Sequence, residues 1–325
     1  MSTSQLLKTL LKSHVDGNDD LFQDVARQIA SHEDRLGHGR LAEDLRAIIE
    51  RPRQQTVRKA VPLNQPKGEL ADLLDVSYPR LTLSDMVLEQ SVVAKLGRTI
   101  KEQRHMVQIN AHGLSARRKL LLVGAPGTGK TMTAAVMAAE LSMPLYRVRL
   151  DALISKFLGE TASKLRLVFD AMKDHRGVYF FDEFDAIASQ RGMANDVGEI
   201  RRALNSFLQI IEQDESGSLI LAATNHPEIL DYAVFRRFDD LVHYELPDAE
   251  RIKMTLQNRL AGFTPTEIDW NQIASQATGL SYADLVKASE DAIKEAIIFE
   301  QPRFSEESLL QLFDERRAMR VFRNQ

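Results

Sequence analysis

The sequence predicts an α/β fold: a parallel sheet flanked by helices, preceded by a small N-terminal helical module and followed by a C-terminal helical lid. Two observations carry the prediction. In the middle of the chain short apolar runs alternate with stretches of helical periodicity, and past Pro247 only helical periodicity remains. Such alternation is typical of parallel strands joined by helices that cover both faces of a sheet. The runs interpreted as strands are Leu120–Val123, Leu145–Leu150, Val178–Phe181, Leu219–Ala223 and Val242–Leu246.

Apolar residues at helical spacing define the other elements. Between the strands the helical stretches are Thr131–Leu141, Thr161–Met172 and Glu199–Glu212, and in the lid they are Ala249–Leu260, Trp270–Gln276, Ser281–Phe299 and Glu306–Arg316. Prolines among basic residues near position 60 are typical of an extended linker. We therefore divide the chain into an N-terminal helical module (residues 1–50), a basic linker (51–70), a large α/β subdomain (71–247) and a helical lid subdomain (248–325).

The composition narrows the class of protein. Of the 325 residues 44% are hydrophobic and 27% charged, which is ordinary for globular domains. A net charge of −4 gives no general attraction to nucleic acid or anionic membranes. The chain has no cysteine, which excludes disulfides. It has neither a signal-peptide pattern nor a run of about 18 apolar residues, so we expect a cytoplasmic location.

A glycine-rich loop lies between the first of these apolar strands and the helix after it. It matches the pattern G-x-x-x-x-G-K-[ST] in the strand–loop–helix context that this pattern requires. Its glycines let backbone amides converge on phosphates, and the following helix N-terminus adds partial positive charge. We expect Lys130 to reach the β- and γ-phosphates and the Thr131 hydroxyl to bind Mg²⁺. The predicted nucleotide-binding residues here are Gly124, Ala125, Pro126, Gly127, Thr128, Gly129, Lys130, Thr131 and Met132.

Two carboxylates come directly after the apolar strand Val178–Phe181. We expect Asp182 to hold Mg²⁺ together with Thr131, and Glu183 to polarise the attacking water. The alternative is that the acidic pair only caps a following helix.

With these motifs the chain resembles the AAA+ ATPases, and within them the AAA group, from about Leu83 to Leu310. The resemblance implies Mg²⁺-dependent hydrolysis of ATP. It also implies that Asn225, which comes after the strand Leu219–Ala223, positions the lytic water with Glu183, although an asparagine there is otherwise a common turn residue. The segment whose backbone recognises adenine would be Asp85, Met86 and Val87. In the lid Ala283 would approach the nucleotide, and Tyr282 stands where the family usually has glycine.

The segment Asp231–Asp239 is similar to the second region of homology of this family, in a compact version like that of katanin and spastin. The resemblance implies that Arg236 and Arg237 act as arginine fingers on the nucleotide of the adjacent subunit in a homo-oligomeric ring, a hexamer. Such a finger would stabilise charge on the transferred phosphoryl group. The alternative is that both are ordinary surface arginines.

A short aromatic loop precedes the helix that starts near Thr161. In this position AAA protein remodellers carry a loop that lines the central pore, and an aromatic side chain can grip polypeptide of any sequence through apolar contact. The corresponding residues are Lys156, Phe157, Leu158 and Gly159. Phe157 packed within its own domain is the alternative. Residues 189–198 would form a second pore loop or an ordinary connection.

Three classes of function remain open. The first is a remodeller or unfoldase of protein substrates. The second is a nucleic-acid motor or loader, for which Lys156 and the basic residues between 98 and 119 leave room, although a solvated helix face is the simpler interpretation of the latter. The third is a nucleotide switch with little turnover, against which Glu183 argues. Residues Leu10–His14 and Gln28–Glu33 of the N-terminal module also resemble the N-terminal segment of bacterial AAA ATPases encoded beside subtilisin-like proteases. This resemblance implies a separate partner protease and a role in antiviral defence.

Overall fold

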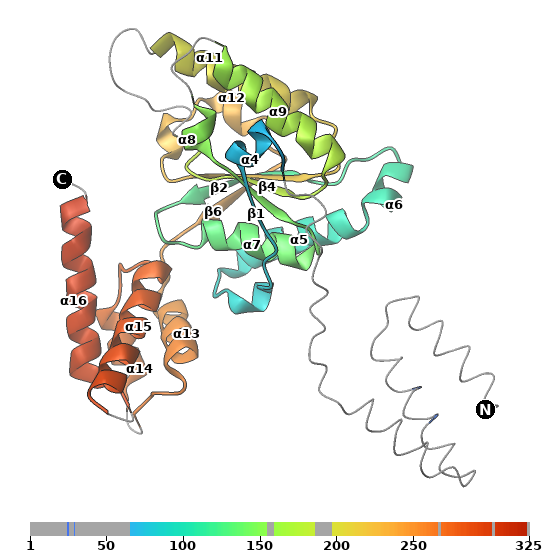
Figure 1. Ribbon diagram of the computed structural model, residues 1–325. Helices are drawn as coiled ribbons and strands as arrows, with labels where there is room; N and C mark the ends of the chain where they lie inside the picture. Colours follow the sequence, from blue (N-terminus) through green and yellow to red (C-terminus); the bar gives the residue numbers. More distant parts are fainter. Residues whose placement is uncertain are drawn as a thin grey trace. The chain divides into compact units, whose positions relative to one another are not determined.

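A computed structural model gives the structure of residues 66–154, 159–185, 197–265, 268–300 and 303–323, together with Val25 and Ile29 (Figure 1). The chain divides into two compact units, Met1–Asn64 and Gln65–Gln325. In the first unit Val25 and Ile29 are helical, and Val25 is buried. The rest of the predicted N-terminal module and most of the predicted linker lie outside the described residues. The second unit contains the predicted α/β and lid subdomains.

One sheet forms the centre of this second unit. In the part of the chain that the structure describes it has six strands in the order β1-β3-β4-β5-β2-β6, all parallel except β1, which pairs antiparallel with β3. The strands are β1 (Leu74–Ser77), β2 (Lys119–Gly124), β3 (Leu145–Val148), β4 (Val178–Phe181), β5 (Leu219–Thr224) and β6 (Asp240–Tyr244). The predicted α/β class with a largely parallel sheet is therefore confirmed. The edge strand β1 is not among the predicted strands.

Helices cover both faces of the sheet, which is why β2, β4 and β5 are buried along their whole length. Alternate residues of a strand face opposite sides. Leu121 and Phe181 accordingly join a core with α4, α8, α9, α11 and α12, whereas Leu122 and Phe180 join a second core with α5 and α7. Figure 1 shows these helices as two layers on either side of the sheet. The helices of this part are α4 (Glu69–Leu73), α5 (Gln90–Arg104), α6 (Met106–Ala111), α7 (Lys130–Glu140), α8 (Leu150–Leu153), α9 (Glu160–Asp174), α11 (Val197–Gln213) and α12 (Tyr232–Phe235), with the 3-10 turns η1 (Leu83–Asp85) and η2 (Pro227–Ile229).

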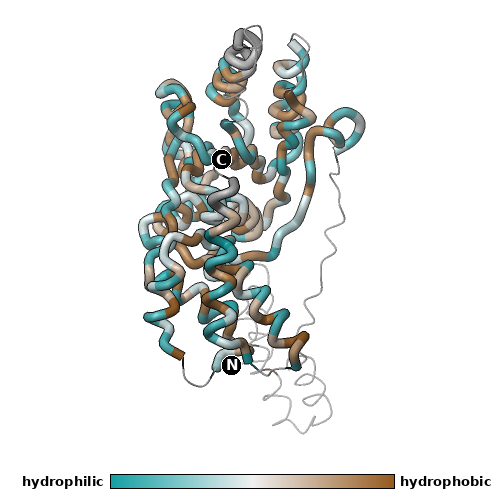
Figure 2. The backbone as a smooth tube through the Cα atoms, turned by 90° about the vertical axis from the view of Figure 1, so that its left-hand side faces the viewer, coloured by the Kyte–Doolittle hydropathy of each residue, from teal (hydrophilic) through white to brown (hydrophobic). Residues whose placement is uncertain are grey.

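The C-terminal part is helical, as predicted, and has a core of its own, in which Leu256, Leu285 and Phe313 are fully buried. Its helices are α13 (Ala249–Leu260), α14 (Trp270–Gln276), α15 (Tyr282–Ile298) and α16 (Glu306–Arg323). Figure 2 colours the backbone by hydropathy and shows polar and apolar residues interspersed along its helices. The predicted end of α16, at Arg316, is too early. Among the described helices none combines the length and the apolar character needed to cross a membrane.

The basic residues between 98 and 119 fall into two groups. Arg98 and Lys101 are exposed on α5, as expected for a solvated helix face. Lys119 is buried and its ammonium donates to the Ile211 carbonyl, and Arg118 pairs with the buried Asp214. For these two the interpretation as a solvated face is wrong, because they attach the start of β2 to the end of α11.

Candidate nucleotide site

The residues predicted to bind phosphate, Mg²⁺ and the attacking water lie at the carboxyl ends of β2, β4 and β5, where ligands usually bind in open α/β sheets. The loop after β2 turns through left-handed backbone at Gly127 (φ 77°) and Gly129 (φ 105°), a conformation that glycine adopts without steric cost. At Gly127 a side chain is also excluded by space, since a Cβ there would lie 2.5 Å from Ser281 Oγ of the lid. The loop therefore depends on glycine both for its backbone path and for its contact with the lid.

Lys130, the first residue of α7, has a buried side chain. Its Nζ donates to the carbonyl oxygens of Gly124 (2.7 Å) and Ala125 (2.9 Å). Burial lowers the pKa of Lys130, and the nearby carboxylates of Asp182 and Asp185 oppose this shift. The two carbonyls accept two of the three ammonium hydrogens and carry no charge, and the ammonium has no ion pair among the described residues, so an anionic phosphate fits this position.

The Thr131 hydroxyl donates to Asp182 Oδ2 at 2.9 Å, which brings together the two predicted metal-binding residues, one on α7 and the other directly after β4. Among the described residues no group of three or more His, Asp or Glu side chains could hold a metal. Mg²⁺ usually keeps several waters and takes one or two protein ligands with phosphate oxygens. The Thr131–Asp182 pair therefore fits Mg²⁺ bound together with a nucleotide.

The acidic turn is fixed by the aromatic residues on either side of it. Phe181 and Phe184 are fully buried, and both pack against Phe207 of α11, with ring centroids 5.2 and 4.7 Å away. Between them Glu183 is exposed and has left-handed backbone (φ 51°), which is uncommon outside glycine and often marks functional positions. Glu183 borders an open hollow of about 570 Å³ that also reaches Arg147 and Arg149.

Asp185 is a site residue that the sequence motifs did not single out. Its Oδ1 accepts from Thr224 Oγ1 at 2.8 Å and from the Asn225 backbone N–H at 3.4 Å, and the Phe184 N–H donates to the Ala223 carbonyl. Because these bonds join the ends of β4 and β5, they hold the Asn225 backbone next to the turn that carries Glu183. The sequence does contain a signal for Asp185, because it is the third acidic residue within four positions after an apolar strand.

A cavity of about 80 Å³ lies between the phosphate loop, the segment that begins at Asp85, and the lid. The segment predicted to recognise adenine thus lies beside the loop. The Asp85 carboxylate itself accepts from the Thr82 N–H (2.7 Å), a hydrogen bond that lowers the pKa of Asp85. Ala283 is not among the lining residues, but its N–H donates to the Gly127 carbonyl at 3.1 Å. The cavity is lined by Asp85, Met86, Val87, Leu88, Thr128, Gly129, Met132, Thr255, Asn258, Arg259, Tyr282 and Val286.

The two predicted finger arginines have partners in their own chain. The Arg236 guanidinium lies 4.7 Å from the centre of the Tyr232 ring. Arg237 Nε lies 2.9 Å from Glu212 Oε2, an ion-pair distance without hydrogen-bond geometry. The partners of the two arginines thus lie on α12 and α11, and among the described residues neither arginine forms an ion pair with Asp182 or Glu183.

Of the predicted pore loop, Lys156, Phe157 and Leu158 lie outside the described residues. Gly159 is exposed, has left-handed backbone (φ 82°) and immediately precedes α9. A side chain there would meet open space, so the requirement for glycine is one of backbone conformation. Most of the possible second loop, residues 189–196, also lies outside the described residues.

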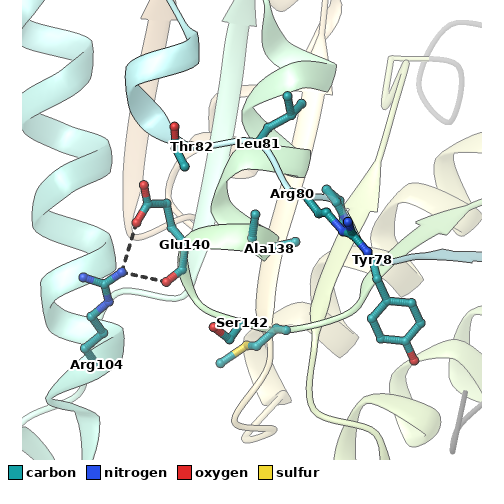
Figure 3. A pocket seen from close by; sticks show the side chains of 11 residues that line it. Tyr78, Arg80, Leu81, Thr82, Arg104, Ala138, Glu140 and Ser142 are labelled. Carbon is teal, nitrogen blue, oxygen red and sulfur yellow. Dashed lines mark hydrogen bonds and ion pairs between the residues drawn. The ribbon is translucent and has the colours of Figure 1, made fainter. Parts of the chain in front are cut away.

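A separate groove of about 540 Å³ opens near Ser142 and Met143, which precede β3. It therefore lies at the opposite edge of the sheet from the phosphate loop. Figure 3 shows Arg104 of α5 turned toward Glu140 at the end of α7, where it donates to the carbonyl (2.7 Å) and to Oε2 (3.0 Å), while Tyr78 points away from this pair.

The fold and the carboxyl edge of the sheet define a P-loop nucleoside triphosphatase. The model of the ATPase family associated with various cellular activities (AAA) matches residues 120–246. The chain is 37% identical over 301 residues to an uncharacterized AAA family ATPase, y4kL, of Sinorhizobium fredii, a match that covers 92% of this chain and 90% of the relative. The chain therefore belongs to the AAA family of ATPases, and it hydrolyses ATP with Mg²⁺.

Two further relatives match this chain over only part of their own length. An ATP-dependent zinc metalloprotease FtsH 4 of Sphaerobacter thermophilus is 32% identical over 232 residues, which is 68% of this chain but 35% of that protein. A putative 26S proteasome regulatory subunit homolog of Methanothermobacter marburgensis is 32% identical over 208 residues, or 62% of this chain and 55% of the relative. For these relatives the match covers only part of the protein.

Proposed function

We propose that the chain works in a homo-oligomeric ring, a hexamer, that remodels or unfolds protein substrates, and that each nucleotide site is completed by Arg236 and Arg237 of the neighbouring subunit. One observation carries the proposal. The residues that we propose for phosphate, metal and base lie together within one chain, whereas Arg236 contacts Tyr232 and Arg237 pairs with Glu212. The open hollow beside Glu183 offers room for a side chain from outside.

In this proposal each group of the nucleotide has its own protein residues. The loop amides between Gly124 and Gly129 and the Lys130 ammonium bind the β- and γ-phosphates. Thr131 and Asp182 hold Mg²⁺, which when bound neutralises charge on the phosphate oxygens. Glu183 accepts a proton from the attacking water or orients it, and Asn225 holds the same water from the neighbouring strand end.

The base lies in the cavity beside η1. Backbone groups of Asp85, Met86 and Val87 recognise its edge, Met132 contacts it from α7, and α13 and α15 enclose it from the lid. Ala283 contributes through the phosphate loop, because its N–H holds the Gly127 carbonyl. The lid is thereby part of the nucleotide site rather than a separate module.

A protein substrate passes through the ring and is gripped by the loop of Lys156, Phe157, Leu158 and Gly159. The names of the relatives support this choice, since a zinc metalloprotease and a proteasome regulatory subunit both belong to protein breakdown. We extend the proposal to a separate protease as partner, acting in antiviral defence, on the resemblance of the N-terminal module. The cytoplasmic location stays a prediction.

Measuring the ATPase rate against protein concentration, with an unfolded protein or DNA added in parallel, tests the proposal. We expect the rate per chain to rise steeply with concentration and to be stimulated by unfolded protein. Phe157→Ala should keep the basal rate and lose processing of an unfolded substrate. A rate per chain that is constant on dilution contradicts the ring, and stimulation by DNA alone would favour a nucleic-acid motor.

A further inference from the structure

Tyr282, the first residue of α15, separates two cavities. One is the base cavity of about 80 Å³, and the other is a smaller space of about 10 Å³ bounded by Glu89, Val92, Tyr244 and Arg251. Among the described residues only Leu88 and Tyr282 line both. The Tyr282 side chain comes from the lid and Leu88 from the core, so these two residues form the partition between the cavities.

The backbone on either side of Tyr282 is fixed. Ser281 caps α15 in a capping box, in which its Oγ accepts from the Asp284 N–H and its own N–H donates to Asp284 Oδ2 at 2.9 Å. On the other side the Ala283 N–H is bonded to the Gly127 carbonyl. Ser281 is held by the capping box and Ala283 by the phosphate loop. The end of α15 therefore cannot shift and carry the Tyr282 ring out of the partition without breaking these bonds.

The partition is an uncharged aromatic surface at neutral pH. Burial raises the pKa of Tyr282 to about 12, an effect that Arg251 opposes and that Asp248 and Glu89 reinforce. A neutral ring is a suitable neighbour for a purine, since aromatic planes interact favourably edge-on or offset-stacked.

We propose that Tyr282 is a specificity-determining residue of the base pocket, whose ring closes the pocket on the lid side and sets the largest base that fits. The inference rests on the proposed nucleotide site. A cavity of about 80 Å³ is far below the roughly 300–1,000 Å³ of usual ligand pockets, so it has no slack for a larger base. Removing the ring joins the smaller cavity to the base pocket and supplies that space.

The test measures binding by the full chain of ATP and of three ATP analogues with bulky groups at N6, C2 and C8 of the base, by displacement of a fluorescent nucleotide. We expect wild-type protein and Tyr282→Phe to discriminate strongly against all three. In Tyr282→Ala the discrimination against at least one analogue should fall by about tenfold or more, as for other pockets relieved of a steric limit. The matched control is Tyr78→Ala, in the groove of Figure 3 at the other edge of the sheet, which should leave every ratio unchanged.

Unchanged ratios for all three analogues in a Tyr282→Ala protein that binds ATP and melts cooperatively would overturn the inference. If that variant does not fold, Tyr282→Leu, which keeps an apolar side chain without the ring, gives the same test with a smaller expected change. Lys130→Ala distinguishes failure of the nucleotide site from failure of the Tyr282 role. ATP binding that survives this change would remove the proposed nucleotide site, whereas Lys130-dependent binding with unmoved ratios removes the role of Tyr282 alone.

Discussion

The carboxyl edge of the sheet and the short helix α12 differ in what their charged side chains already contact. At the sheet edge Lys130 has two neutral carbonyl partners and the Thr131–Asp182 pair is preformed. Directly after α12, Arg236 rests against an aromatic ring and Arg237 against a carboxylate. In the proposed ring the first region would receive the nucleotide without losing a partner for its metal pair, whereas the two arginines would have to exchange their present partners to reach a neighbouring site. Substitutions in both regions test this difference, from the largest expected effect to the smallest.

Lys130→Ala should abolish ATP binding. The change removes the buried ammonium that faces the phosphates and leaves two loop carbonyls without their donor. Isothermal titration with ATP measures the loss, and Lys173→Ala on the exposed face of α9 serves as the control. Retained affinity would mean that the sheet edge is not the phosphate site.

Arg236→Ala and Arg237→Ala should each lower the ATPase rate, by up to about 10³–10⁵-fold for a finger that works in the transition state. The informative measurement mixes the double variant, which has an intact site, with Glu183→Gln, which has intact arginines. Activity should reappear in the mixture, because a finger-deficient subunit then receives arginines from its neighbour. A mixture as inactive as its components would argue that the arginines act within their own chain.

Glu183→Gln should keep ATP binding and reduce hydrolysis by about 10²–10⁴-fold, the usual contribution of a positioned general base. The substitution keeps the size of the side chain, so the left-handed turn between Phe181 and Phe184 should persist. Single-turnover hydrolysis together with ATP titration separates the two effects. Full turnover would remove Glu183 from the chemistry.

Glu212→Gln should have the smallest effect and the opposite sign. The ion pair with Arg237 is partly exposed and lacks hydrogen-bond geometry, so it is worth roughly 0.2–1 kcal/mol. Freeing Arg237 should lower the protein concentration for half-maximal ATPase by a few-fold, about fivefold at most. Glu215→Gln, an exposed neighbour after α11, is the matched control. A higher half-maximal concentration would mean that Glu212 orients Arg237 for its task.

Much of the core could be predicted because its signals are local. Strands that are buried on both faces appear in the sequence as continuous apolar runs. The phosphate loop is recognised from the fixed spacing of its glycines, lysine and threonine. The strand β1 could not be predicted, since only Leu74 of its four residues is buried. It forms through its partner β3, which the sequence of the strand does not reveal.

The base cavity marks the limit of prediction for the site. Thr255, Asn258 and Arg259 share one face of α13, but nothing in that helix indicates that this face meets the core. Likewise Tyr232 and Arg236 are one helical turn apart and could be paired from spacing, whereas Glu212 and Arg237 meet only because the fold brings α11 beside α12. Contacts between distant elements need the tertiary structure.

The hydrogen bond from Ala283 to Gly127 has a mechanical consequence. The lid has its own core of apolar side chains, and one of its peptide groups is hydrogen-bonded directly to the loop that we propose binds the phosphates. A movement of α15 would therefore shift the Gly127 carbonyl, and with it the glycine-rich loop. Nucleotide binding at the loop and the position of the lid would then be coupled through this hydrogen bond.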